Sequence, residues 1–364
     1  MRKIKLRIKR FFLGSVAACF LFTACEPDPV KIKGPSFHGS AGVFILNEGS
    51  FMGENESLSF YDYRNKVVFN QVFFTANKVP LGDVAQSMTF CEEKGFIVVN
   101  NSAKIWCINA DDAIITGIIT GLESPRNMLI VNERKAFVSD LYARKIYVVD
   151  PNELVVTGSI ETDNHSGRYH QHSAEQMVLV DNKIFAACWS FDNMILVIDE
   201  QTDCVTDSIV VTKQPNSMVV DSNEDLWILS DGGFPGSSYG VEIPALARIN
   251  TATYEIEKEF RFPSVDQSPD NLCINNSGDT LYFLNTGVYK MSVYAESLPT
   301  VPFISTYGRQ FYSLGIDPAS SDIYVADAVD YQQEGIIYRY RADLQLTDSF
   351  RVGIIPGDFY FTEK

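Results

Sequence analysis

The segment Pro215-Asn216-Ser217-Met218 decides the fold, because a motif of the same kind recurs along the chain. Each copy has small or polar residues, then Met, Leu or Phe, then an apolar tail. The other copies are Ala85-Gln86-Ser87-Met88, Pro125-Arg126-Asn127-Met128, Glu175-Gln176-Met177, Pro269-Asp270-Asn271-Leu272, Phe311-Tyr312-Ser313-Leu314 and Pro356-Gly357-Asp358-Phe359. Their last residues are 40, 49, 41, 54, 42 and 45 positions apart. Self-similarity at such a period indicates a repeat architecture.

Two short strand-like runs and a more variable third run follow each of the first six copies. After the first copy these are Phe96–Asn100 and Ile105–Asn109, and after the fifth Leu281–Asn285 and Val288–Ser292. The runs are rich in Val, Ile, Tyr and Phe and are bounded by Asp, Asn and Gly, which is typical of β-strands. No stretch beyond the N-terminal leader shows sustained helical periodicity.

The two ends of the chain complement one another. The copy at 356–359 has no strands after it, whereas the runs Val43–Asn47, Leu58–Asp62 and Lys66–Phe73 have no copy before them. Joining them completes one further blade and leaves no open edge. The sequence therefore predicts an all-β, seven-bladed β-propeller over residues 41–364. Its blades are four-stranded, and the C-terminal strand joins the N-terminal strands to close the ring. A pair of β-sandwiches is the alternative, but it does not predict the spacing.

Residues 1–24 have the pattern of a signal peptide, with six basic residues, no acidic ones and an apolar run from Phe11. The run ends in Leu21-Phe22-Thr23-Ala24-Cys25, which resembles a bacterial lipobox in which Cys25 is acylated. We expect lipidated Cys25 and a tether to residue 40 to hold the protein at the outer membrane, facing the exterior, through the lipid anchor only. An ordinary signal peptide with an incidental cysteine is the alternative.

The charge of the chain argues against nucleic-acid binding. Lys and Arg number 30 against 46 Asp and Glu, and without residues 1–24 the net charge is −22. A field of that sign repels a polyanion. The five cysteines after Cys25 include no CxxC pair, so we expect them to be unpaired and mostly buried, without a zinc site or disulfide framework.

Several segments resemble known propellers. The runs IYVVDP, ILVIDEQT and LARINTAT resemble YncE-type propellers. Asn47-Glu48-Gly49-Ser50-Phe51, Ser139-Asp140-Leu141-Tyr142-Ala143 and the run 322–331 are similar to surface lipoprotein propellers of gut Bacteroidetes, among them the BtuG-type proteins. That resemblance implies capture of cobalamin or another corrinoid and its transfer to a TonB-dependent outer-membrane transporter.

The candidate ligand-binding residues lie on loops of one face. Aromatic side chains there are poorly explained by core packing and offer rigid contact area, while interleaved polar groups offer hydrogen bonds. The candidates are Phe51, Arg126, Tyr142, Arg144, Tyr169, His170, Trp189, Phe191, Phe234, Tyr239, Tyr307, Arg309, Asp330 and Tyr331. A large, flat, amide-fringed and nearly neutral ligand such as a corrinoid suits this set. Packing of loop on loop is the alternative for each ring.

Catalysis is not expected, and no catalytic residue, resident cofactor or metal ligand is assigned. Asp83, Glu175, Asp270 and Asp358 lie near the starts of inner strands, where polar residues of propellers are usually structural. The segment His165–His172 holds three of the four histidines; a solvated loop, a ligand contact and a metal site are its alternatives. A surface propeller that binds a glycan or a protein is the competing function.

Overall fold

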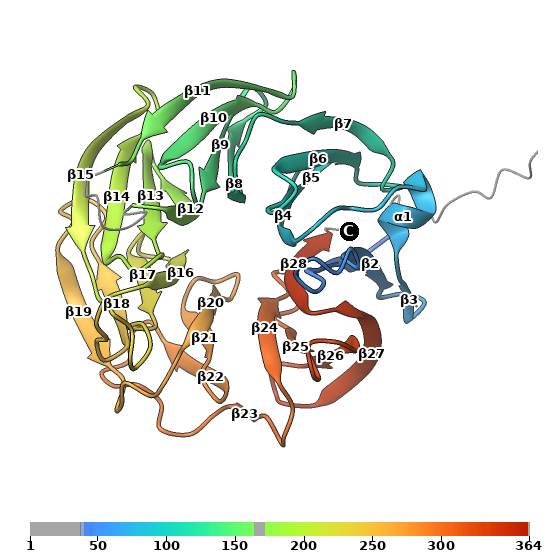
Figure 1. The fold of residues 1–364 in the computed structure, drawn as a ribbon. Helices are drawn as coiled ribbons and strands as arrows, with labels where there is room; N and C mark the ends of the chain where they lie inside the picture. The colour runs from blue at the N-terminus through green and yellow to red at the C-terminus, as the bar shows by residue number, and fades with distance from the viewer. Residues whose placement is uncertain (1–36, 38–39, 164–171, 363–364) are drawn as a thin grey trace, which may run out of the picture. The chain divides into compact units, whose positions relative to one another are not determined.

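The computed structural model describes residue 37, residues 40–163 and residues 172–362. Twenty-eight strands in this part of the chain form seven antiparallel four-stranded sheets, which are arranged as the blades of a ring (Figure 1). The predicted seven-bladed β-propeller is confirmed. Residues Gly34–Lys364 form one compact unit. Among the described residues, no helix combines the length and apolar character needed to cross a bilayer.

Each blade contributes one strand to each of four concentric positions. The inner strands are β4 (Ala85–Cys91), β8 (Pro125–Asn132), β12 (Ala174–Val180), β16 (Pro215–Val220), β20 (Asp270–Ile274), β24 (Phe311–Ile316) and β28 (Pro356–Thr362). The second strands are β5 (Lys94–Val99), β9 (Lys135–Asp140), β13 (Lys183–Cys188), β17 (Leu226–Ser230), β21 (Thr280–Leu284), β25 (Ile323–Asp327) and β1 (Gly42–Asn47). The third strands are β6 (Lys104–Asn109), β10 (Lys145–Asp150), β14 (Met194–Asp199), β18 (Ala245–Ile249), β22 (Gly287–Ser292), β26 (Glu334–Tyr340) and β2 (Ser57–Asp62). The outer strands are β7 (Ile115–Ile119), β11 (Val155–Glu161), β15 (Cys204–Val210), β19 (Ile256–Arg261), β23 (Ile304–Ser305), β27 (Leu346–Ile354) and β3 (Val67–Phe69).

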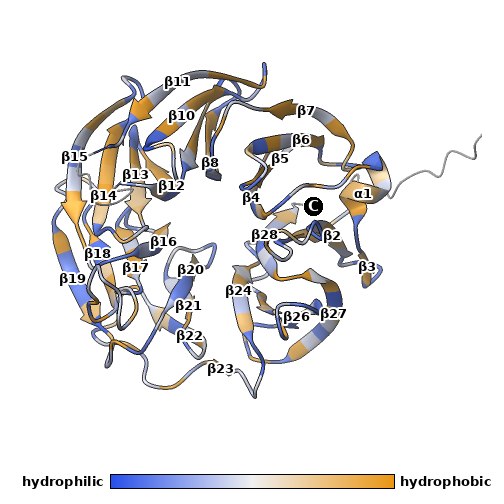
Figure 2. Ribbon diagram, viewed as in Figure 1, coloured by the Kyte–Doolittle hydropathy of each residue, from blue (hydrophilic) through white to orange (hydrophobic). Residues whose placement is uncertain are grey.

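The hydrophobic core is divided into seven layers, each between two neighbouring blades. Second and third strands are buried on both sides and therefore read as continuous apolar runs, which Figure 2 shows as mainly orange strands such as β10 and β14. Outer strands such as β19 alternate, because only one of their faces meets a neighbour. Burial between blades thus accounts for the pattern that marks the strands in the sequence.

The last blade is closed by pairing the two ends of the propeller. Strand β28 pairs antiparallel with β1, with Phe44 opposite Tyr360, and the backbone N–H of Gly42 donates to Thr362 Oγ1 at 2.9 Å. Tyr61 of this blade stacks on Phe350 of the neighbouring blade with ring centroids 4.1 Å apart. Closure therefore leaves β1 with a partner on both sides.

Two details of the prediction are wrong. Residues 66–73 do not form one strand: β3 ends at Phe69, and helix α1 (Val72–Asn77) follows. Val72 and Phe73 are buried against the β1–β2 and β4–β6 layer, and a six-residue helix is too short to produce a periodic pattern. The cysteines are not mostly buried: Cys107 and Cys188 are buried, but Cys91 and Cys273 are half-buried. Cys204 is exposed, because it begins the outer strand β15, whose side chains mostly face solvent.

A β-bulge begins the inner strand of every blade. In each, the pairing of the inner with the second strand shifts register within the motif, for example between Pro215 and Ser217. A bulge adds one residue to one strand and reorients its side chains. The shift falls at or beside the two motif residues that line the axis, so the regular pairing of the inner with the second strand is interrupted there.

The motif residue directly before the Met, Leu or Phe, called here the third motif residue, links one blade to the next. Six of these side chains hydrogen-bond to the backbone of the following inner strand: Ser87 to Arg126 O (2.7 Å), Gln176 to Met218 N and O (2.6 and 3.1 Å), Ser217 to Leu272 N (3.0 Å), Asn271 to Tyr312 O (3.2 Å), Ser313 to Pro356 O (2.6 Å) and Asp358 to Met88 N (2.9 Å). We call these contacts the axial clasps. They provide partners for backbone groups of the inner strands, each of which is the end strand of its sheet.

We expect Ser217→Ala to lower the free energy of unfolding by about 1–2 kcal/mol, because the buried Leu272 N–H then loses its acceptor. Urea denaturation monitored by fluorescence measures the change. Ser208→Ala on the exposed face of β15 is the matched control and should leave stability unchanged. Equal stability of the two variants would contradict a stabilising role for the clasp.

Candidate functional site

A cavity of about 460 Å³ lies on the axis, where the inner strands begin. Its wall contains, from all seven motif copies, the two residues that directly precede the Met, Leu or Phe; these are called the second and third motif residues. The repeat that defines the fold therefore also builds the cavity. These motif residues are Gln86, Ser87, Arg126, Asn127, Glu175, Gln176, Asn216, Ser217, Asp270, Asn271, Tyr312, Ser313, Gly357 and Asp358. Glu48, Trp189 and Asp231 reach it from the ends of second strands. We call it the axial cavity; its volume lies within the roughly 300–1,000 Å³ typical of small-molecule sites.

Arg126 is the one basic residue in the described wall of the axial cavity, and it is held on both sides. Its Nε donates to both carboxylate oxygens of Glu175 at 2.8 Å, and its Nη1 donates to Gln86 Oε1 at 2.5 Å. Gln86, Arg126 and Glu175 occupy the same motif position in three successive blades. The charge-assisted contacts fix the guanidinium against the wall.

Glu48 takes the place that a side chain of β28 would fill. A Cβ on Gly357 would lie 2.2 Å from Glu48 Oε1, so the glycine leaves room for this carboxyl group to reach the axis. Tyr312 OH donates to Glu48 Oε2 at 2.7 Å. Burial raises the pKa of Glu48 to about 7, against the hydrogen bond from Tyr312.

The axial cavity is rich in carboxyl groups that titrate near neutral pH. Burial raises the pKa of Asp270 to about 7 and that of Asp358 to about 6, and it also raises the pKa of Asp231. Glu48 and Glu175 complete five acids against one arginine. The carboxyl oxygens therefore offer hydrogen-bond acceptors, and the cavity gains negative charge as the pH rises through neutrality, which favours N–H donors and disfavours anions.

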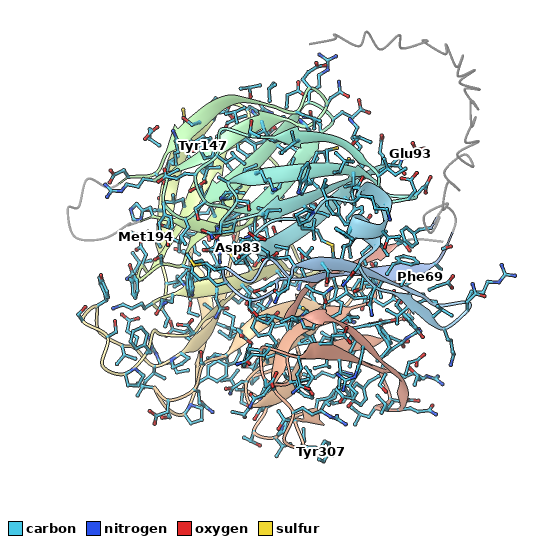
Figure 3. All side chains as sticks on the ribbon, turned by 45° about the vertical axis from the view of Figure 1, so that its right-hand side comes forward. Phe69, Asp83, Glu93, Tyr147, Met194 and Tyr307 are labelled. Atoms are coloured by element: carbon cyan, nitrogen blue, oxygen red, sulfur yellow. The ribbon has the colours of Figure 1, made fainter. Side chains whose placement is uncertain are left out.

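The loops between second and third strands and the loops before inner strands emerge on the same face, because neighbouring strands of a blade are antiparallel. We call it the loop face; the axial cavity lies at this end of the inner strands. Phe51, Tyr142, Phe234, Tyr307 and Tyr331 lie on these loops and are between 44% and 82% exposed. Tyr307 stands out at the edge of the molecule in Figure 3. These five aromatic residues are available for contact with a ligand.

Two of the predicted residues line the axial cavity directly, namely Arg126 and Trp189. The indole Nε1 of Trp189 lies 3.5 Å from Asp231 Oδ2. Tyr331 reaches the wall indirectly, since its ring meets that of Tyr312 edge-on with centroids 5.9 Å apart. The structure thus brings these side chains to one mouth from different blades.

Other predicted residues make contacts within the protein. Phe191 and Tyr239 stack on one another with centroids 4.1 Å apart, which joins the loops of two blades. Arg144 pairs with Asp163 at 3.1 Å, and Asp330 accepts hydrogen bonds from Gln332 N and Gln333 N in its own turn. Arg309 lies over the ring of Tyr338 at 3.9 Å and donates to Tyr340 OH. For these residues the structure provides a packing role. Tyr169 and His170 lie outside the described residues.

The loop that carries Phe51 is anchored to its neighbours. Met52 N donates to the Asp83 carboxylate at 3.0 Å, and Ser50 Oγ lies 3.4 Å from Tyr331 O. The loops bearing Phe51 and Tyr331 therefore lie side by side at the junction of two blades. Asp83, which lies near the start of the inner strand β4, holds this loop.

The residues missing from the sequence-based candidate set are Glu48, Tyr312, Asp231 and most of the motif pairs. The signal was present, because the two residues before the Met, Leu or Phe are polar in every motif copy except at Gly357. Glu48 and Asp231 had no such signal, since they follow second strands and reach the axis only through the tertiary structure.

Fold and site together define a propeller with a polar, acidic axial cavity beside aromatic loops. The chain belongs to the family described as "Domain of unknown function (DUF5074)", whose model matches residues 41–343. No curated protein matches the chain in sequence.

Solved structures share the fold at low sequence identity. A quinonprotein alcohol dehydrogenase-like protein from Bacteroides thetaiotaomicron aligns with a TM-score of 0.65 and 13% identity over 88% of this chain and 78% of its own. A protein from Lactobacillus plantarum aligns with a TM-score of 0.65 and 13% identity over 89% of this chain and 100% of its own. Hydrazine synthase from Kuenenia stuttgartiensis aligns with a TM-score of 0.61 and 14% identity over 75% and 88%. These likenesses show the propeller fold.

We expect Asp270→Asn to stabilise the protein at pH 8 and to have little effect at pH 4. A carboxyl group whose pKa rises from 3.8 to about 7 on folding costs stability as the pH rises through that range, and the amide removes this cost. About 2 kcal/mol is expected at pH 8, given about 1.4 kcal/mol per pKa unit and partial access to water. Urea denaturation at both pH values measures it. Asp343→Asn, an exposed control, should show no such pH-dependent gain; a gain equal to that of Asp270→Asn would contradict the interpretation.

Proposed function

We propose that this propeller captures a corrinoid of the cobalamin type at its loop face and has no catalytic activity. The observation that carries the proposal is a single compact, polar cavity on the axis with exposed aromatic side chains on the surrounding loops. A cavity of this shape suits a compact ligand better than a linear polymer. The resemblance to BtuG-type lipoproteins supports the choice of a corrinoid among compact ligands.

The chemistry of the axial cavity is complementary to a ligand with a fringe of amide groups. The carboxyl groups of Glu48, Asp270 and Asp358 accept hydrogen bonds from amide N–H groups, and Asn216 and Gln86 offer both donors and acceptors. A cobalamin is larger than the cavity, so its corrin ring would lie across the mouth. There Trp189 and Tyr331 provide flat surfaces for apolar contact.

A role in binding without catalysis is supported by the hydrogen bonds that carboxylates of the cavity make within the protein. Asp358 accepts the backbone N–H of Met88, and Glu175 is bound by both carboxylate oxygens to Arg126. A carboxylate that fastens neighbouring blades is not free to exchange protons with a substrate. The rigid ring that results favours affinity, because little conformational entropy remains to be lost on binding.

The location is proposed from the leader, and the partner from the resemblance to BtuG-type lipoproteins. We propose that the lipid on Cys25 anchors the propeller to the outer membrane from outside, and that a TonB-dependent transporter receives the ligand.

Capture of a glycan or of a protein is the second candidate. It is favoured by the exposed rings of Phe51, Phe234 and Tyr307, which lie outside the axial cavity and offer stacking surfaces to sugar rings or apolar side chains. In that case substitutions of these rings would weaken binding, while substitutions in the cavity would not.

Isothermal titration of the mature chain, residues 26–364, with cyanocobalamin and with cobinamide tests the proposal. We expect saturable binding of one corrinoid per chain, weakened at least tenfold by Trp189→Ala or Tyr331→Ala because each removes aromatic contact at the mouth. A tenfold loss corresponds to about 1.4 kcal/mol.

Tyr294→Ala is the matched control. Tyr294 is an exposed tyrosine on the loop between a third and an outer strand, which lies on the opposite face, so its loss should not change affinity. Absence of binding to both corrinoids, or an equal loss with Tyr294→Ala, would overturn the proposal.

A further inference from the structure

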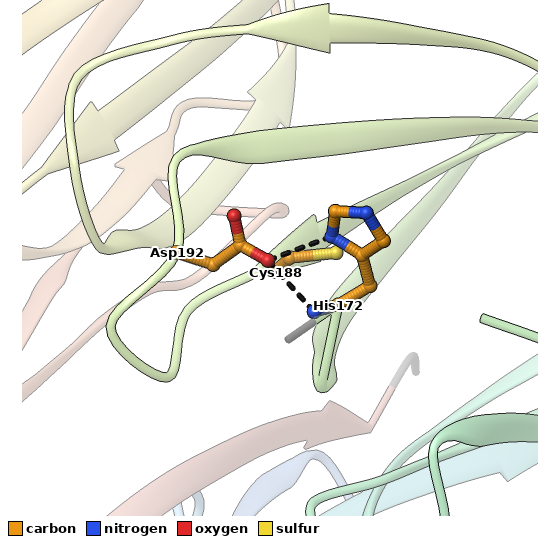
Figure 4. A group of neighbouring side chains, drawn as sticks. All are labelled: His172, Cys188 and Asp192. Carbon is orange, nitrogen blue, oxygen red and sulfur yellow. Dashed lines mark hydrogen bonds and ion pairs between the residues drawn. The ribbon is translucent and has the colours of Figure 1, made fainter. Parts of the chain in front are cut away.

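Three metal-ligating side chains meet beside the loop face in the blade β12–β15. A ring nitrogen of His172, Sγ of Cys188 and a carboxylate oxygen of Asp192 all lie within 4.8 Å of one another. His172 Nδ1 is 2.7 Å from Asp192 Oδ2, and Figure 4 shows the thiol of Cys188 beside this contact. Cys188 is fully buried and Asp192 nearly so. The three come from separate positions: the start of the blade, the end of β13, and the β13–β14 loop.

The repeat does not require this cluster. In the blade β8–β11, Asp140 ends the second strand and accepts the backbone N–H of Ser124 at 2.7 Å, which holds the loop before the inner strand. Asp327 ends β25 and accepts Gln310 N at 3.0 Å in the same way. Cys188 occupies that strand position in β13, where it pairs with Ala174 as Asp140 pairs with Pro125.

At the start of β12, the residue that accepts the backbone N–H lies in the β13–β14 loop and not at the end of the second strand. Asp192, four residues beyond Cys188, accepts the backbone N–H of His172 at 2.7 Å and so performs the holding role of Asp140. The thiol of Cys188 and the imidazole of His172 are therefore additions to the arrangement that the blades β8–β11 and β24–β27 use. Their chemistry, one sulfur and one nitrogen beside one oxygen, is that of a ligand set for a borderline-soft metal ion.

We propose that His172, Cys188 and Asp192 bind one divalent transition-metal ion of the Zn²⁺ class. Three protein ligands leave one position of a tetrahedral site for water or another ligand. The metal–sulfur bond forms as the thiol of Cys188 loses its proton to solvent, and the metal takes the Nδ1 lone pair of the neutral imidazole, whose proton then resides on Nε2. Asp192 contributes a carboxylate oxygen in exchange for its hydrogen bond to Nδ1.

The site would fasten the loop that carries Trp189 and Phe191 to the start of β12. Cys188 directly precedes Trp189, and Asp192 directly follows Phe191, so both ends of this four-residue stretch would be tied to one ion. The metal would therefore stabilise the wall of the axial cavity at Trp189. The inference does not depend on which ligand the loop face captures.

Titration of the metal-free mature chain with Co²⁺ tests the site, because a thiolate bound to Co²⁺ gives a charge-transfer absorption that oxygen and nitrogen ligands do not. We expect one equivalent of Co²⁺ to produce this absorption and one equivalent of Zn²⁺ to abolish it. Cys188→Ser should remove the absorption, and Asp192→Asn should weaken Zn²⁺ binding at least tenfold in competition with a chelating dye. The Asn variant retains an oxygen that can accept the His172 N–H, so it should keep the fold.

Cys107→Ser is the matched control, since Cys107 is equally buried but lies in β6 outside the cluster. It should bind Co²⁺ and Zn²⁺ as the unchanged chain does. Circular dichroism of each metal-free variant checks folding. No thiolate absorption in the unchanged chain, or an absorption that survives Cys188→Ser, would overturn the proposal.

Discussion

The axial clasps are the interaction on which the rest of the structure depends. Inner strands of neighbouring blades are too far apart to form a continuous sheet, so their facing backbone groups need other partners. Side chains such as Ser217 and Asp358 provide them, each reaching from one blade to the backbone of the next. Because Asp358 joins β28 to β4, the same kind of contact that links successive blades also spans the junction between the chain's two ends. Each clasp links one blade to its neighbour.

The clasps also explain why the axial cavity is polar. The bulge that directs a third motif residue at the next blade directs the second residue at the axis, so the cavity wall is a by-product of holding the blades together. Those second residues differ from blade to blade, from Arg126 to Asp270 to Gly357, because the clasp does not constrain them. The protein can therefore vary the chemistry of its cavity without altering the ring. The burial of several carboxyl groups with raised pKa values is a cost in stability that the seven apolar layers between blades offset.

The blade β12–β15 departs most clearly from the repeat, and it does so next to the cavity. Cys188 stands where the blades β8–β11 and β24–β27 have an aspartate. Asp192 holds the start of β12 instead, and Trp189 between them lines the axial cavity. The stacked pair Phe191 and Tyr239 joins this loop to the next blade. The loop that carries Trp189 and Phe191 is therefore supported both from the start of β12 and from the next blade.

The sequence by itself determined the ring, because a four-stranded unit that buries both faces repeats its apolar runs and its polar motif at nearly constant spacing. The complementary ends of the chain likewise determined how the ring closes. It did not determine helix α1, whose six residues are too few to show a period, nor the exposure of Cys204 on an outer strand. For the candidate site, sequence reasoning found Arg126 and Trp189 but missed Glu48 and Tyr312, which meet on the axis from opposite ends of the sequence. Only the tertiary structure decided which loop aromatics face solvent and which pack together. Whether a ring on a loop touches another loop depends on how neighbouring blades are placed in space, and that placement leaves no period in the sequence.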